Sequence, residues 1–204
     1  MTLRLKLAVL ATALGLAACS SPTMHYYTLV APLHSEATSG APAPFQFEML
    51  PVLLPVQVDQ PPLVVRQGDG SLAILDTERW GAPLGDEFHD ALTAQLEQRW
   101  GRRDMAGLPK EGDLPVLSLR TDVRRFESVP GQYALLDVVW NLSLRGGAEG
   151  GKRQTLTCSS VIREQAGSGL DSLVIAHQKA ISRLADSIAR GTQAWVSQPG
   201  KGCP

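Results

Sequence analysis

Side chains that could perform catalysis or bind a metal are few in this chain, whose 204 residues include three cysteines and four histidines. His89 and Asp90 are neighbours in a predicted helix, but one pair without a second cluster of ligands is more typical of a solvated helix face than of a metal site. His177 lies near the apolar stripe of a later predicted helix, which predicts a half-buried, hydrogen-bonded histidine. The sequence contains no Walker loop and no HExxH, CxxC or GxSxG motif. We therefore expect no catalytic activity, no cofactor and no bound metal.

Cys19 has the most informative surroundings of the three cysteines. Two basic residues, Arg4 and Lys6, precede an apolar run over residues 7–16. That run is shorter than the roughly 20 residues of a bilayer-spanning helix and has the proportions of a secretory signal. The run ends in Leu16-Ala17-Ala18-Cys19, which resembles the bacterial lipobox, where the leader is removed and the cysteine becomes a lipidated N-terminus.

The lipobox predicts how the N-terminal part of the chain is organised. We expect a lipoprotein signal peptide over residues 1–18, a covalent lipid on Cys19 and a polar tether over residues 19–25. Several acyl chains on one cysteine anchor a protein stably, because each buried methylene contributes ~0.8 kcal/mol. Ser20 and Ser21 follow the cysteine, with no aspartate in the next position. By resemblance to lipoprotein sorting in Gram-negative bacteria, this predicts a domain anchored to the outer membrane and facing the periplasm.

The other two cysteines, Cys158 and Cys203, would lie in a compartment that permits disulfides. Cys158 follows the buried phase of its predicted strand, which favours a small core residue and hinders access from the C-terminal tail. A bridge to Cys203 would close a loop of about 44 residues and contribute about 3–4 kcal/mol to stability. The sequence leaves both alternatives open.

The charge balance argues against a nucleic-acid partner. The formal net charge is −1, and removing the leader with its two basic residues moves it to about −3. No basic run or patch stands out. Arg124-Arg125 is interpreted as a solvated strand edge, with the binding of an acidic partner as the alternative.

Hydrophobic periodicity predicts one domain over residues 26–196, followed by a C-terminal tail over 197–204. Apolar residues at helical spacing predict two single-faced helices, over 83–100 and 170–195, the second opened by a capping box from Ser168 to Asp171. Alternating residues predict strands over 26–29, 45–49, 63–65, 72–75, 117–123, 134–144 and 156–162. The last three form an antiparallel meander with one buried face. We expect an α/β two-layer sandwich, in which a mostly antiparallel mixed sheet carries both amphipathic helices on one face.

Residues 53–66, LLPVQVDQPPLVVR, combine three prolines with seven aliphatic residues. Proline cannot donate to a β-ladder, so this segment is not a central strand throughout. It is either wrapped into the core or offered to another protein. The contact residues expected under the second interpretation are Pro55, Val56, Asp59, Pro61, Pro62, Arg79 and Trp80. If residues 63–65 form a buried strand instead, only residues 55–62 remain exposed.

The order of these motifs resembles the ABC-type transport auxiliary lipoproteins, the PqiC-like family, over residues 26–195. The resemblance rests on the lipobox and on five later motifs. In chain order these are Tyr26-Tyr27 with Leu29, Leu54-Pro55 with Asp59 and Pro61, Val65-Arg66, Arg79-Trp80 with Pro83-Leu84, and Arg125-Phe126-Glu127 before a strand with Trp140. The pair Pro61-Pro62 departs from the single proline that is more usual there.

The resemblance implies a non-catalytic subunit that works with an MCE-domain protein spanning the periplasm and, indirectly, with an inner-membrane ABC transporter. Its implied role is to dock the spanning component at the outer membrane, so that lipids or other hydrophobic molecules pass between the membranes. The implied assembly is a homo-oligomeric ring. A free-standing carrier with a hydrophobic ligand between sheet and helices is the alternative, and an envelope hydrolase would need a nucleophile–base pair that the sequence does not reveal.

Overall fold

The computed structural model describes residues 22–32, 41–68, 70–110, 112–146, 153–198 and 202–203. Cys19 and the expected leader lie outside the described residues, as does part of the Pro- and Ala-rich segment that follows the first strand. The described residues between 22 and 198 form one continuous hydrophobic core, with a smaller cluster beside it.

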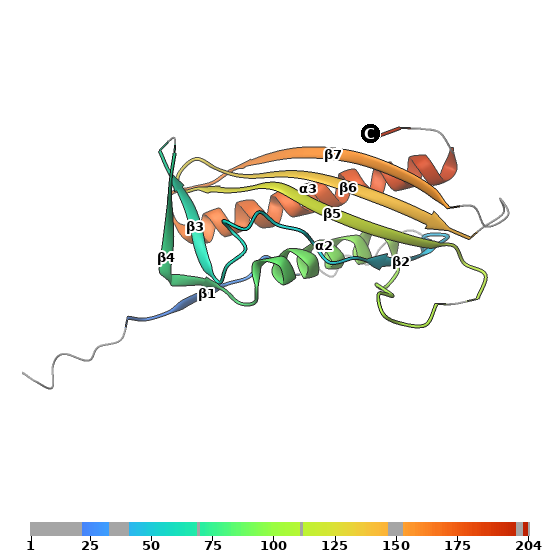
Figure 1. Ribbon diagram of the computed structural model, residues 1–204, viewed down its shortest axis with the longest axis horizontal. Helices are drawn as coiled ribbons and strands as arrows, with labels where there is room; N and C mark the ends of the chain where they lie inside the picture. The colour runs from blue at the N-terminus through green and yellow to red at the C-terminus, as the bar shows by residue number, and fades with distance from the viewer. Residues whose placement is uncertain are drawn as a thin grey trace, which may run out of the picture.

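Four strands form the larger sheet, in the order β2-β5-β6-β7. β5, β6 and β7 are antiparallel neighbours, which confirms the meander, and β2 pairs parallel to β5. Their bounds are Gln46–Met49 for β2, Val116–Val129 for β5, Tyr133–Arg145 for β6 and Gln154–Gln165 for β7. The three long strands curve together along the length of the molecule (Figure 1).

The remaining strands form a separate three-stranded sheet, in the order β1-β4-β3. β1 spans His25–Tyr27, β3 spans Pro62–Gln67 and β4 spans Ser71–Trp80. The β3–β4 hairpin stands across one end of the larger sheet (Figure 1). Gly68 takes the positive φ of 61° that the hairpin turn requires. The α/β class is as predicted, but the expected single sheet is two sheets, because alternation specifies which residues share a face and not which strands share hydrogen bonds.

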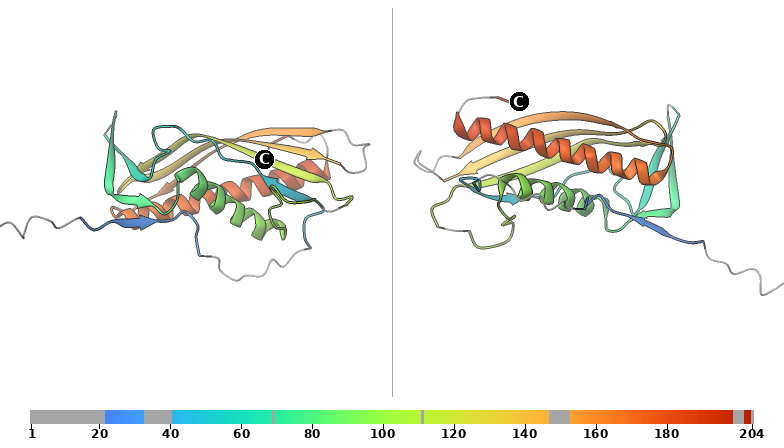
Figure 2. Two further views of the ribbon diagram at one scale, coloured as in Figure 1. Left: turned by 60° about the horizontal axis from the view of Figure 1, so that its bottom comes forward. Right: turned by 180° about the vertical axis from the view of Figure 1, so that it is seen from behind.

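Both helices lie on the same face of the larger sheet (Figure 2). α2 spans Leu84–Trp100 and α3 spans Leu170–Ser197. Pro83 occupies the N-cap position of α2, and Gly101 ends it in the left-handed conformation, with φ 60°. The expected capping box of α3 is wrong: Gly169 is its N-cap, and the Ser172 hydroxyl donates to the Gly169 carbonyl oxygen at 2.7 Å.

Trp140 lies at the centre of the layer between sheet and helices. It is fully buried and shares one cluster with Leu92 of α2 and Leu184 of α3, as its place in the alternation predicts. Its indole N–H donates to the Ser160 hydroxyl of the neighbouring strand at 3.0 Å. The buried side of β6 therefore carries the helices.

The chain that leaves β1 is hydrogen-bonded to both helices. Glu87, in the first turn of α2, accepts hydrogen bonds from the Thr28 hydroxyl at 2.7 Å and from the Leu29 backbone N–H at 2.8 Å. The Gln178 amide of α3 donates to the Thr28 carbonyl oxygen at 3.0 Å. Glu87 is itself buried.

A disulfide joins Cys158 of β7 to Cys203. It connects the edge strand of the larger sheet to the segment that follows α3. The buried position of Cys158 therefore does not prevent pairing with the tail.

Candidate docking surface

Residues 53–62, here called the docking loop, connect the two sheets. The loop begins beside β5, where the Leu53 N–H donates to the Thr121 carbonyl oxygen and the Val123 N–H donates to the Leu53 carbonyl oxygen. A tight turn follows, in which the Val58 and Asp59 N–H groups both donate to the Pro55 carbonyl oxygen. This turn buries Val58 and leaves Val56 85% exposed. Local hydrogen bonding thus holds an apolar residue out in solvent.

The structure brings most of the predicted contact residues to one region. Val56, Asp59 and Pro61 are exposed, and Pro55 and Pro62 are partly buried. Residues 63–65 form a buried strand, so the exposed part of the segment ends at its prolines, as the alternative interpretation predicted. Arg79 stays accessible on β4, where its Nε lies 3.4 Å from the Asp76 carbonyl oxygen.

Trp80 does not belong to this surface. It is 4% exposed, and its ring meets Phe126 edge-on with centroids 6.2 Å apart. The expectation that Trp80 contacts a partner directly is therefore wrong. It packs β4 against β5, and its backbone N–H donates to the Pro61 carbonyl oxygen of the docking loop at 2.9 Å.

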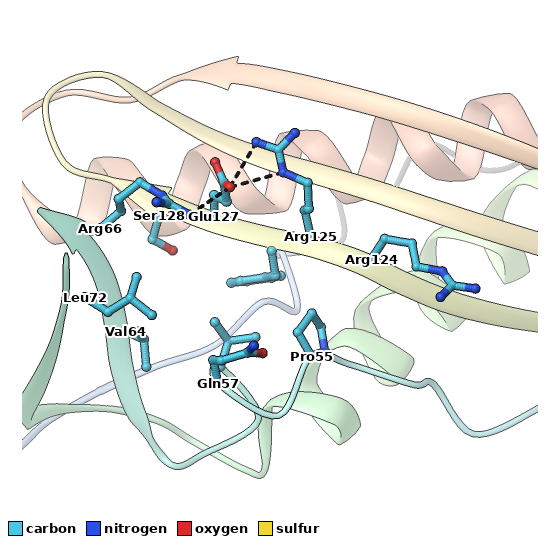
Figure 3. Close-up of a pocket in the computed structure, with 11 residues that line it drawn as sticks. Pro55, Gln57, Val64, Arg66, Leu72, Arg124, Arg125, Glu127 and Ser128 are labelled. Carbon is cyan, nitrogen blue, oxygen red and sulfur yellow. Dashed lines mark hydrogen bonds and ion pairs between the residues drawn. The ribbon is translucent and has the colours of Figure 1, made fainter. Parts of the chain in front are cut away.

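A groove runs between the docking loop, the β3–β4 hairpin and β5, and encloses about 210 Å³ (Figure 3). Its apolar residues include Val58, Val64 and Phe126, which are buried, and Leu72, which is 48% exposed. Three arginines complete it: Arg66 from β3, and Arg124 and Arg125 from β5. The groove shares Pro55 with the predicted contact set, so loop and groove form one continuous surface.

Glu127 holds two of these arginines in place. Its Oε1 lies 3.1 Å from Nη2 of Arg66 and 3.0 Å from Nη2 of Arg125, and the two side chains converge on it in Figure 3. Burial alone would raise the pKa of Glu127, but the hydrogen bond and charge of Arg125, with the charge of Arg66, keep this pKa below its usual value. The carboxylate is therefore ionised at neutral pH, and it orients both guanidinium groups.

Ser128, which lines the groove, and His177 behind it form a serine–histidine pair that the sequence did not reveal. The Ser128 hydroxyl lies 2.8 Å from His177 Nε2, and the imidazole stacks on Phe126 at 4.1 Å. His177 Nδ1 has no hydrogen-bond partner in the structure, so no carboxylate orients the ring. Burial lowers the pKa of His177 to about 3, which makes it a weak base for activating a serine. The pair is a buried structural contact, and the histidine is fully rather than half buried.

Other sites are sparse in the part of the chain that the structure describes. Its histidine, cysteine and acidic side chains form no group that could hold a metal ion. Neither of its helices combines the length and apolarity needed to cross a bilayer.

Comparison with known proteins identifies the family. The model of the ABC-type transport auxiliary lipoprotein component family matches residues 27–189, which is most of the chain. The chain belongs to this family. No curated protein matches the sequence significantly. The auxiliary lipoprotein is thus assigned by its family model, in agreement with the resemblance of its motifs.

Solved structures agree on the fold of the auxiliary lipoprotein. An uncharacterised protein matches with a TM-score of 0.58 and 18% identity, over 83% of this chain and 98% of that one. A Xanthomonas campestris protein assigned to the DUF330 family matches with a TM-score of 0.56 and 18% identity, over 87% of this chain and 98% of that one. At this identity the two structures support the architecture alone.

Proposed function

We propose that this auxiliary lipoprotein docks the periplasm-spanning MCE-domain component of an ABC transport system at the outer membrane. In this role it serves the passage of lipids or other hydrophobic molecules between the membranes and the integrity of the envelope. The observation that carries the proposal is the docking loop, which presents Val56 to solvent beside a hollowed surface.

The composition of the docking loop suits protein contact. Pro55, Pro61 and Pro62 restrict its conformations, so ordering it on binding costs little entropy. Leu53 and Val56 offer exposed apolar area at its start. An exposed aliphatic group on a stiff, hydrogen-bonded loop is a ready-made anchor for a complementary pocket.

The lipid anchor is the second part of the proposal. Lipid on Cys19 confines the domain to a surface and raises its effective concentration for a partner and for other copies of itself. Ser20 and Ser21 are consistent with outer-membrane sorting. A homo-oligomeric ring that receives the end of the spanning component is the assembly that we propose.

The carrier alternative receives less support from the packing. A carrier needs an apolar cavity between sheet and helices. Fully buried side chains occupy that layer here, among them Phe47, Phe88, Trp140 and Leu142. The same residues form one continuous cluster with α3, as expected of a filled core.

Charge placed on the docking loop tests the proposal. Val56→Asp and Pro61→Asp are expected to abolish co-purification of the MCE-domain protein with the tagged lipoprotein. Both residues are exposed, so the thermal melt should barely change. Val161→Asp is the matched control, because Val161 is 66% exposed on β7, away from the docking loop. The proposal fails if both loop variants stay folded and retain the partner as the wild type does, or if the wild type retains no such partner.

A further inference from the structure

The groove beside the docking loop combines an apolar floor with a surplus of positive charge. Three of its lining residues are arginines, and Glu127 is its one acidic residue. Arg124 also pairs with Asp122, which lies outside the lining, at 3.0 Å. The side chains of Arg124 and Arg125 are 61% and 50% exposed, so both are accessible to a ligand.

We propose that this groove binds a segment of the partner protein in which an aliphatic residue lies next to one or more carboxylates. The aliphatic side chain packs over Val58, Val64 and Phe126, and the carboxylates meet Arg124 and Arg125. This inference rests on the docking function proposed above and names the chemistry of the segment that docks.

The geometry of Arg125 suits a second carboxylate. Its Nε and Nη2 both donate to Glu127, at 3.1 and 3.0 Å. A guanidinium has five N–H donors, so this bond orients the group and leaves further donors for an incoming anion. Since Glu127 already holds the guanidinium group of Arg125 in place, binding an anion costs little additional side-chain entropy.

The size of the groove favours a peptide segment over a lipid. Its volume of about 210 Å³ suits one or two aliphatic side chains. Pockets that enclose a whole small molecule usually hold ~300–1,000 Å³. Val56 of the docking loop lies next to the groove and offers additional apolar area. A peptide longer than the groove could contact Val56 with its flanking residues.

Photo-crosslinking in the full-length, membrane-anchored protein tests the inference. The photoreactive residue p-benzoylphenylalanine replaces Leu72 in the groove or, as a control, Val161 on β7. We expect crosslinking from position 72 and not from position 161. Mass spectrometry should place the crosslink in the MCE-domain protein, in a segment with an aliphatic residue beside aspartate or glutamate.

Charge reversal provides the second measurement. Arg124→Glu combined with Arg125→Glu should lower the crosslinking yield at least tenfold, because two charge-assisted hydrogen bonds become repulsions. The control is Arg120→Glu combined with Arg153→Glu, which changes the net charge by the same amount. Both residues line a separate hollow, so this variant should leave the crosslinking yield unchanged. Circular dichroism checks that both double variants are folded.

The outcomes separate this inference from the docking function. Crosslinking to lipid, to a second copy of this chain or to a partner segment without carboxylates overturns the inference. An unchanged yield in the folded Arg124/Arg125 variant overturns it as well. A third outcome is that the partner co-purifies in a Val56-dependent way but position 72 gives no crosslink. In that case the docking function stands, and the groove is not the site at which the partner binds. If the wild type retains no MCE-domain partner, the docking function itself fails.

Discussion

At the scale of single residues, His177 shows how strongly the fold sets a side chain's chemistry. Its ring is enclosed between Phe126 and the body of α3, and its single hydrogen bond goes to Ser128. A charged imidazole in this position would lose its hydration without gaining a counter-ion. The folded protein therefore holds His177 neutral well below neutral pH.

Neutral His177 predicts a specific pH dependence of stability. The folded pKa is about 3 and the ordinary value is 6.5, so between these values the unfolded chain binds an additional proton. Stability from this group is complete above pH 6.5 and declines as the pH falls. Between pH 8 and pH 5 the loss is about 2 kcal/mol. Denaturant unfolding measures the free energy of unfolding at the two pH values. The decrease in this free energy from pH 8 to pH 5 should be smaller in His177→Gln than in the wild type, by about 2 kcal/mol. Equal losses in the two proteins would contradict the buried, neutral state.

Trp140 gives the second prediction at this scale. Trp140→Ala removes the largest fully buried side chain and should lower the free energy of unfolding by ~3–5 kcal/mol. Trp140→Phe, which keeps an aromatic ring in the core, should cost clearly less. Thermal unfolding that hardly differs between Trp140→Ala and the wild type would mean that β6 does not present Trp140 to the helices.

At the scale of elements, the disulfide between Cys158 and Cys203 ties the segment after α3 to β7. The two cysteines are 45 positions apart. In the chain-entropy model, closing such a loop contributes up to about 4 kcal/mol. Cys203→Ser should therefore lower the denaturant midpoint under oxidising conditions and make the protein insensitive to reductant. A variant that unfolds at the same midpoint as the oxidised wild type would show that the bridge does not constrain the unfolded chain.

The elements that the sequence predicted well are those whose pattern is local. Both helices and the β5–β6–β7 meander follow from apolar periodicity alone, because each buries one face along its whole length. The pairing of β1 with β4 did not follow from the sequence, since the two strands are far apart in the chain and pair in parallel. Hydrogen-bond partners over such distances leave no periodic signal.

The candidate site was predictable only in part, because only its local features leave a signal in the sequence. Proline and aliphatic composition marked the docking loop as a candidate contact segment, and the structure shows Val56 of that loop exposed. The buried state of Trp80 depends on Phe126, and the groove depends on arginines from two strands of different sheets. Contacts of this kind arise only when distant segments fold together.

At the scale of the whole molecule, the lipid expected on Cys19 predicts attachment to a membrane. Cys19→Ala should leave an uncleaved or soluble form, because the modified thiol is replaced. Membrane fractionation measures the redistribution, and intact-mass analysis of the wild type should show acyl chains on an N-terminal Cys19. A mature wild-type protein that begins at an unmodified Cys19 would end the anchoring hypothesis.

The way in which β1 joins the domain has a mechanical consequence for a protein anchored at Cys19. β1 runs parallel to β4, in register from His25 opposite Glu78 to Tyr27 opposite Trp80. A pull along β1 loads the hydrogen bonds between these strands together, in shear, whereas a peeling force would break them one after another. The bonds of Glu87 and Gln178 to the residues just after β1 pass the same load to α2 and α3. The tether would carry the full tension between a membrane and a docked partner, but where that tension enters the domain it would be shared among β4, α2 and α3 and not borne by β1 alone.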